Sequence, residues 1–313
     1  MDTNTHRGAA VEVPNKAAGK ATGAAAGKLL VGLIGCGIQR SLTPALHEAE
    51  AAAQGLRLHY QLIDLDPVPS SQPQGMDALP SLLAAARTMG FAGLNITYPC
   101  KQAVIPLLDS LSDEAQAIGA VNTVVFKGGK ATGHNTDGSG WRASLQQQLP
   151  GANLKRVVLL GAGGAGSAIA HALLRMKTEA LVLVDSHTQR AGELTERLNA
   201  LYPGRRASYT ANAAAALAGA TGLVHATPTG MDKLPGLPLP AALLRPDLWV
   251  SEIVYFPLHT ALVQAATALG CRTAHGAGMA VGQAVDAFRL FTGREADIAR
   301  MQAHMRQLLH GQA

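Results

Sequence analysis

Aromatic and charged residues are both scarce in this chain of 313 residues: only 4% are Phe, Trp or Tyr, and only 15% carry a charge. The formal net charge of +5 is modest and the sequence shows no basic stripe, which argues against a nucleic-acid partner. No segment offers about eighteen consecutive apolar residues, so we expect no membrane span. Because 48% of the residues are hydrophobic, the chain can bury two compact cores, and we expect two domains.

Cysteine is also rare. Cys36, Cys100 and Cys271 are odd in number, far apart, and outside any CxxC or Cys/His ligand spacing. This pattern predicts neither a disulfide framework nor a metal site, and it favours a reducing compartment, the cytoplasm.

What the chain does contain is a glycine-rich motif near its middle. An apolar segment at 157–160 precedes this motif, and an Ala-rich helix and a second strand ending at Asp185 follow it. In this pattern glycines allow a tight turn, a close approach of backbone N–H groups to a pyrophosphate, and contact between helix and strand. The predicted dinucleotide-binding residues are Gly161, Ala162, Gly163, Gly164, Ala165, Gly166 and Asp185.

Asp185 is placed where an acid would accept hydrogen bonds from the two hydroxyls of the adenosine ribose of NAD. The same carboxylate would repel the roughly two negative charges of the 2′-phosphate of NADP. Residues 186–189 bring no fixed cation for that phosphate, and we expect Arg190 a turn into the following helix. The sequence therefore favours NAD, although a helix N-cap role for Asp185 stays open.

Strands and helices alternate along most of the chain, which predicts an α/β fold. The expected strands lie at 29–35, 58–64, 93–97, 120–126, 131–134, 157–160, 181–184, 223–226 and 250–254. We predict a disordered tail (1–28), a substrate-binding and catalytic domain with a mixed, mostly parallel sheet (29–137), and a Rossmann-type dinucleotide-binding domain (138–277). The C-terminal helices, 278–313, should complete the first domain, and a cleft between the domains should hold the chemistry.

Two segments of the first domain, 95–101 and 135–137, place polar groups at predicted strand ends, where open α/β sheets bind ligands. Pro99 suits the start of a helix, so Lys101 would lie near a positive helix terminus, an unfavourable place for a cation. Taken alone, Lys101 also fits a surface lysine and Asp137 also fits a helix N-cap. The residues by themselves therefore leave these roles open.

Four dispersed motifs resemble the signature blocks of the shikimate dehydrogenase family and occur in that family's order. They are Asn95-x-Thr97-x-Pro99-x-Lys101, Ala120-Val-Asn122-Thr123, Asn135-Thr-Asp137-Gly138 and Gly278-Met279-x-x-x-Gln283-Ala284. An earlier block, residues 35–44, is similar to the family's substrate-carboxylate loop. The resemblance runs from about residue 29 to residue 293 and implies an oxidoreductase that acts on a CH–OH group.

The resemblance implies roles for individual residues. Lys101 and Asp137 are the implied acid–base pair, and Ser41 and Thr43 are implied to hold a ring carboxylate. Further implied contacts to the substrate come from Thr97, Asn122, Tyr255 and Gln283. Beyond the glycine motif, the implied cofactor-binding residues are Thr227, Pro228, Met231, Gly276 and Met279.

Departures from the family's pattern bear on substrate and cofactor. Arg40 stands where the family often has His, and Thr43 replaces a serine. Together with Asp185, these changes resemble the NAD-preferring branch that oxidises quinate as well as shikimate. On the nicotinamide side, His225 replaces the usual Asn, and Glu252 replaces a shorter Asp.

We therefore expect a cytoplasmic, metal-free, NAD-dependent dehydrogenase that interconverts shikimate with 3-dehydroshikimate, quinate with 3-dehydroquinate, or both. Its partner would be a small hydroxylated cyclohexene or cyclohexane carboxylate, with no nucleic acid or membrane, and the chain would be a monomer or homodimer. The open alternatives are an NADP-dependent biosynthetic shikimate dehydrogenase, an aminoshikimate or aminoquinate dehydrogenase, and a non-catalytic dinucleotide-binding sensor. A short-chain dehydrogenase is disfavoured, because Tyr98 and Lys101 are three positions apart, too close for Tyr-x-x-x-Lys.

Overall fold

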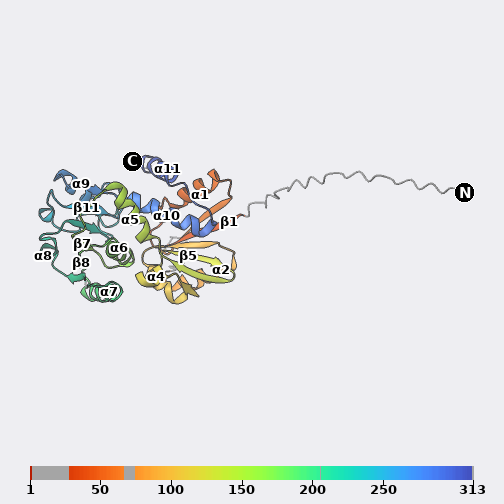
Figure 1. Cartoon of the computed structure of the whole chain (residues 1–313). Coiled ribbons are helices and arrows are strands. Elements are labelled where there is room, and N and C mark those ends of the chain that lie inside the picture. The colour runs from red at the N-terminus through yellow and green to blue at the C-terminus, as the bar shows by residue number, and fades with distance from the viewer. Residues whose placement is uncertain (2–27, 67–74, 205, 312–313) are drawn as a thin grey trace.

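The computed structural model describes residue 1 and residues 28–66, 75–204 and 206–311. The predicted disordered tail lies almost entirely outside these described residues. Two six-stranded sheets, each flanked by helices, organise the described chain (Figure 1). The α/β fold expected from the sequence is confirmed.

The first sheet has the strand order β2-β1-β3-β5-β6-β4. Among its described strands only β5 runs against the others, and it pairs with β6 in the hairpin predicted from the sequence. The elements are β1 (Leu29–Gly35), α1 (Thr43–Ala53), β2 (Leu58–Asp64), α2 (Leu79–Thr88), β3 (Gly93–Ile96), α3 (Cys100–Ala103), β4 (Ser110–Leu111), α4 (Asp113–Ile118), β5 (Thr123–Lys127) and β6 (Lys130–His134).

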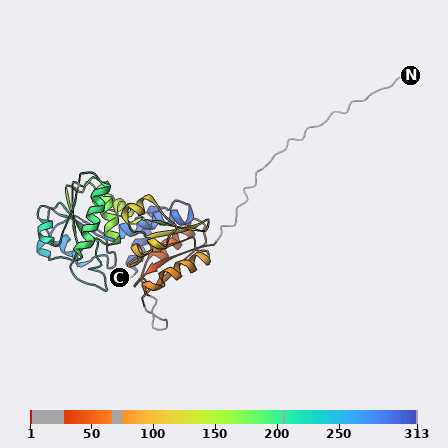
Figure 2. The ribbon, with the colours of Figure 1, turned by 90° about the horizontal axis from the view of Figure 1, so that it is seen from below.

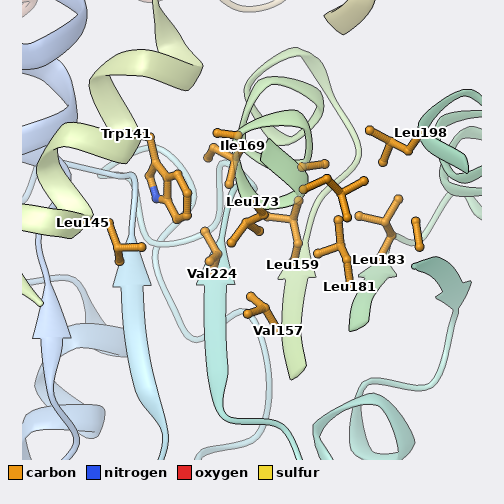
Figure 3. Packing of buried hydrophobic residues seen from close by; sticks show 14 of the residues in the cluster. Trp141, Leu145, Val157, Leu159, Ile169, Leu173, Leu181, Leu183, Leu198 and Val224 are labelled. Carbon is orange, nitrogen blue, oxygen red and sulfur yellow. The ribbon is translucent and has the colours of Figure 1, made fainter. Parts of the chain in front are cut away.

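The second sheet is parallel throughout, in the order β12-β11-β10-β7-β8-β9. This is the doubly wound order of dinucleotide-binding sheets. Its elements are β7 (Arg156–Leu160), α6 (Gly164–Arg175), β8 (Ala180–Val184), α7 (Thr188–Leu201), β9 (Ala207–Thr210), α8 (Ala213–Leu217), β10 (Gly222–His225), β11 (Trp249–Glu252), α9 (Ala261–Ala268) and β12 (Thr273–Ala274). Figure 3 shows Leu159, Leu183 and Val224 of this sheet packed against Ile169 and Leu173 of α6.

Two long helices, α5 (Asp137–Gln148) and α10 (Gly276–Thr292), lie between the sheets (Figures 1 and 2). They approach closely, because a side chain on Gly140 or Gly282 would collide with the backbone of the other helix. The far end of α10 packs against the first sheet, where Phe291 joins the core formed with Val31 and Leu33. The last helix, α11 (Ile298–His310), packs on α1 and α10. The chain therefore leaves the first sheet through α5 and returns to it through α10.

Three short strands were not predicted: β4, β9 and β12. All three lie at sheet edges and lack a continuous apolar run, whereas the predicted four-residue strands β3, β10 and β11 are buried along their whole length. The first strand of the hairpin also begins three residues later than predicted, at Thr123. The preceding residues belong to a connection in which the Val121 N–H donates to the Lys101 carbonyl.

A histidine lies in the core between α1 and the first sheet. His47 is fully buried, and its ring lies 5.1 Å from the ring of Tyr60, 6.1 Å from Phe288 and 6.0 Å from Phe291. Within the described part of the chain, neither ring nitrogen has a hydrogen-bond partner. Burial therefore lowers the pKa of His47 to about 3.

We expect His47 to destabilise the fold in acid. Its pKa is about 3 in the folded protein against 6.5 for an exposed histidine, so the unfolded chain binds more protons between these values. Stability should fall as the pH drops below that upper value, and between pH 7 and pH 5 this group should cost on the order of 2 kcal/mol. The variant His47→Leu cannot titrate at this position. Between pH 7 and pH 5 its free energy of unfolding, measured by urea denaturation, should therefore fall by about that much less than that of the wild type. The same pH dependence in both proteins would contradict this account.

Candidate active site

Lys101 and Asp137 meet at the carboxyl ends of two strands of the first sheet. Lys101 lies in α3, which follows β3, and Asp137 opens α5, which follows β6. Since β3 and β6 run in the same direction, both residues emerge at the same edge. Nζ of Lys101 donates to Oδ2 of Asp137 at 2.5 Å, and the side chains are 17% and 5% exposed. The N-cap of α5 is Thr136, so Asp137 does not act as the cap of its helix.

Asn122 holds the other oxygen of the carboxylate. Its Nδ2 donates to Oδ1 of Asp137 at 3.0 Å and to Oγ1 of Thr136 at 2.8 Å. Its Oδ1 accepts from Oγ1 of Thr123 at 3.0 Å and from the Thr136 N–H at 2.8 Å. All four hydrogen-bonding positions of this amide are thus used within the protein. A ring hydroxyl bound by Asn122, as the resemblance implies, would have to replace one of these bonds.

The other predicted substrate contacts come from separate segments. Ser41 lies in the loop after β1 and Thr43 is the first residue of α1, and a hydrogen bond of 3.1 Å joins their hydroxyls. Burial raises the pKa of Tyr255, and the neighbouring Ser41 hydroxyl partly offsets this effect. Thr97 follows β3 directly, and the carbonyl of Gln283 in α10 accepts from the Thr136 hydroxyl beside Asp137, at 3.1 Å. The fold therefore brings the backbone of Gln283 to Thr136, the residue before Asp137, and brings Tyr255 to Ser41.

Arg40 is occupied by a partner from the other half of the chain. Its Nη1 donates to Asp232 at 2.7 Å, and the guanidinium carbon lies 4.0 Å from the ring centroid of Phe256. A second pair, Lys233 with Asp66 at 2.9 Å, joins the same two regions. These exposed pairs link the loops that follow β1 and β2 to the loop that follows β10. A carboxylate-bearing ligand would find the charge of Arg40 already paired.

The glycine motif has the geometry that a dinucleotide requires. Gly161 has φ +99°, a conformation that L side chains rarely adopt, and a Cβ on Gly166 would collide with the Gly161 carbonyl. No atom lies within 4 Å of the place where a Cβ of Gly163 would be. α6 then begins at Gly164 without a side-chain cap, so its first N–H groups can meet phosphate oxygens. A Cβ on Gly164 would lie 3.0 Å from Cβ of Lys101, which places the motif beside the acid–base pair.

Asp185 follows β8 and Arg190 lies in the next helix, as predicted, but the contact between these two side chains was not expected. Arg190 lies in the first turn of α7, and its Nη2 donates to both oxygens of Asp185 at 2.8 Å. The carboxylate also accepts from the N–H groups of Ala162 at 2.7 Å and His187 at 2.8 Å. Burial alone would raise the pKa of Asp185, but these hydrogen bonds outweigh it and hold the pKa below its usual value. A cation therefore lies against the carboxylate of Asp185.

A buried histidine–carboxylate pair lies at the ends of two strands of the second sheet. Nδ1 of His225, at the end of β10, lies 2.9 Å from Oε1 of Glu252, at the end of β11. The side chains are 0% and 1% exposed. Glu252 also accepts from the Val254 N–H at 2.9 Å and from the Thr260 hydroxyl at 3.0 Å, and Nε2 of His225 faces the Thr227 hydroxyl at 2.5 Å. His225 and Glu252, the two departures from the family's pattern noted above, thus contact each other, and His225 holds the Thr227 hydroxyl in place.

The remaining predicted cofactor contacts differ in accessibility. Pro228 and Met231 share the loop after β10, where the Met231 N–H donates to the Pro228 carbonyl at 3.2 Å and the Met231 side chain is exposed. Gly276 opens α10 so close to β11 that a Cβ there would collide with the Ile253 carbonyl. Met279, by contrast, is only 8% exposed and belongs to the core of the second sheet. The structure does not present it as an open cofactor contact.

Two residues that hold the site were not predicted: Thr136, between Asn122 and α10, and Arg190. The hydroxyl directly before Asp137 was a visible signal in the sequence. The five-residue spacing of Arg190 from Asp185 was visible too, but only the helix start at Thr188 brings the guanidinium back to the carboxylate.

The His, Cys, Asp and Glu side chains of the described residues form no group of three that could hold a metal ion, and all three cysteines are free thiols. Each helix in this part of the chain is too short or too polar to cross a membrane.

Known proteins resemble this chain over most of its length. It matches the family model of the shikimate dehydrogenase substrate binding domain over residues 33–124 and that of the shikimate 5′-dehydrogenase C-terminal domain over residues 276–306. It is similar to a shikimate dehydrogenase (NADP+) of Streptomyces avermitilis, at 56% identity over 89% of this chain and 95% of that protein. A quinate/shikimate dehydrogenase (NAD+) of Corynebacterium glutamicum is 48% identical over 88% of this chain and 96% of that protein. Among solved structures, quinate dehydrogenase from C. glutamicum in complex with NAD has a TM-score of 0.80 and 45% identity, covering 90% of this chain and 99% of that one.

The buried pair generates a stability prediction. Glu252→Ala would leave His225, the Val254 N–H and the Thr260 hydroxyl without their partner, and removing one member of a buried pair costs on the order of 3–5 kcal/mol. Glu252→Gln keeps an oxygen for the backbone donor and should cost clearly less. Guanidinium denaturation followed by circular dichroism measures the free energy of unfolding of both variants and of the wild type. Equal losses would show that the acceptor oxygen is unimportant.

Proposed function

The chain belongs to the shikimate dehydrogenase family, and we propose that it is an NAD-dependent dehydrogenase of quinate and shikimate in which Lys101 and Asp137 are the acid–base pair. The observation that carries this proposal is the 2.5 Å contact between these two side chains, beside the glycine motif. The proposed enzyme interconverts a ring alcohol and the corresponding ring ketone.

The proposed reaction assigns different tasks to the two residues. A bound nicotinamide would supply or accept the hydride at the carbon that bears the reacting oxygen. In reduction the ammonium of Lys101 stabilises the negative charge that grows on that oxygen and donates a proton to it, and in oxidation the neutral amine accepts the proton. Asp137 orients the amine through Oδ2, while the bond from Asn122 to Oδ1 keeps the carboxylate from rotating.

The proposed ligand contacts follow the segments around the pair. The pyrophosphate would lie on the open N–H groups at the start of α6. The nicotinamide side would be formed by Thr227, Pro228, Met231 and Gly276. The substrate carboxylate would lie on Ser41 and Thr43, and the ring hydroxyls and ring face on Thr97, Asn122, Tyr255 and Gln283.

The preference for NAD rests on Asp185. Its backbone contacts to Ala162 and His187 fix the carboxylate, whereas the 43% exposed side chain of Arg190 can move aside for the ribose hydroxyls. A 2′-phosphate would meet the negative charge of Asp185 unless Arg190 left that carboxylate to bind it. NADP-dependent oxidation of shikimate is the second candidate, because the Streptomyces relative is named for NADP.

The proposal also includes a cytoplasmic location, supported by three free thiols, two of them buried. It includes a monomer or homodimer as the working assembly and a reaction without metal.

Removing the amine should abolish turnover without abolishing binding. Lys101→Met keeps the apolar stem that lies against Gly164 but cannot transfer a proton, so kcat should fall by about 10²- to 10⁴-fold. Steady-state assays with quinate and shikimate measure the loss, and quenching of NADH fluorescence checks that cofactor binding is retained. Wild-type protein that turns over neither compound with either cofactor would refute the proposed function.

Exchanging the carboxylate should change the cofactor preference. Asp185→Ser removes the repulsion and frees Arg190 for a 2′-phosphate, so the ratio of kcat/KM for NAD to that for NADP should fall by about tenfold or more. The double variant Asp185→Ser/Arg190→Ala is the matched control, because it removes the repulsion without supplying the cation. It should recover little of the NADP activity. An unchanged ratio in the single variant would contradict the role of Asp185.

A further inference from the structure

A chain of buried side chains extends from the acid–base pair into the first sheet. Oγ1 of Thr123 in β5 accepts from Nδ2 of Asn95 in β3 at 3.1 Å. Oδ1 of Asn95 accepts from the hydroxyl of Tyr60 in β2 at 2.7 Å. Because Thr123 also donates to Asn122, which donates to Asp137, four consecutive hydrogen bonds join Tyr60 to the carboxylate.

The backbone fixes the orientation of both amides in this chain. The Thr136 N–H can only donate, so the atom of Asn122 that it meets at 2.8 Å is the oxygen, and Nδ2 must face Asp137. The carbonyl of Asn122 can only accept, so the atom of Asn95 that lies 3.4 Å from it is the nitrogen. Tyr60 must therefore donate to Asn95, and Thr123 must donate to Asn122.

In each of these four hydrogen bonds the donated proton thus points toward Asp137. Hydrogen bonds aligned in one direction polarise one another, and they do so more strongly where water is excluded. The side chains lie in such a place, since Tyr60 and Asn95 are each 4% exposed and Thr123 is 0% exposed. The negative end of the chain is the carboxylate that orients Lys101.

We propose that Thr123, Asn95 and Tyr60 are positioning residues for this reaction, acting on Lys101 through Asn122 and Asp137. The proposal rests on the proposed function, because it takes the lysine–aspartate pair as the acid–base machinery. None of the three residues needs to touch the substrate. Their hydroxyl and amide groups keep the Asn122 amide turned toward Asp137, so that the carboxylate holds the amine in one place.

Thr123 offers a matched pair of variants. Thr123→Val keeps the shape of the side chain but loses the hydroxyl, so the Asn122 amide loses one of its donors and the Asn95 amide loses one of its two acceptors. We expect kcat to fall by about tenfold, with KM for substrate and for NAD within about twofold of wild type. Thr123→Ser keeps the hydroxyl but loses the methyl group, and kcat should stay within about twofold of wild type. A packing role predicts the opposite order, with the serine variant more impaired.

Tyr60 tests whether the chain acts as a unit. Tyr60→Phe removes only the terminal hydroxyl and should lower kcat by about two- to fivefold. In the double variant Tyr60→Phe/Thr123→Val the chain is already broken at Thr123, so kcat should be no lower than in Thr123→Val alone. Tyr209→Phe, on the exposed edge strand β9, is the control and should leave kcat unchanged.

Three kinetic outcomes would overturn the proposal: wild-type kcat in Thr123→Val, an equal loss in Thr123→Ser, or additive losses in the double variant. A crystal structure of Thr123→Val gives a readout that does not depend on turnover. The Asn122 amide should be displaced from Asp137, and an amide in its original place would also overturn the proposal. Absence of turnover in the wild type would instead refute the proposed function, and the two failures are therefore distinguishable.

Discussion

The hydrogen bond between Lys101 and Asp137 depends on the direction of two strands. β3 and β6 are separated in the sheet by the antiparallel β5, so they run the same way and end at the same edge. The helices that follow these strands then bring an amine and a carboxylate together from positions far apart in sequence. If either strand ran the other way, its carboxyl end would lie at the opposite edge of the sheet, and the two side chains would be about one strand length apart.

The two buried carboxylates at the candidate site are each held by several partners. Asp137 is held by Lys101 and Asn122, and Glu252 by a histidine, a backbone N–H and a hydroxyl. A buried charge without such partners would be costly, because no water replaces the lost hydration. The same requirement fixes the rotamers of these side chains, so the arrangement that satisfies the buried groups also orients the site.

The two helices between the sheets relate the halves of the site to each other. α5 begins at Asp137, which contacts Lys101, and α10 begins at Gly276, against the end of β11. Their close contact at Gly140 and Gly282 leaves little room for one helix to shift against the other. The position of the glycine motif relative to Lys101 therefore depends on a contact that lies outside both sheets.

Local sequence was sufficient for the features that depend on neighbouring residues. The bounds of β1 and β2 were predicted to the residue, and the glycine motif was recognised because its turn and its helix start are local. The pairing of Lys101 with Asp137 was expected only from the family resemblance, since neither residue alone excluded an ordinary surface or capping role. The short edge strands β4, β9 and β12 were not predicted, because their sequences show no clear pattern of apolar residues.

Strand order and register decided the rest. The contact of His225 with Glu252 and the position of Thr123 between two amides could not be found from local patterns. A local pattern indicates which face of a strand is buried, but not which other buried group lies opposite. That partner is set by the packing of distant segments, and a buried polar side chain takes whichever partner the packing supplies.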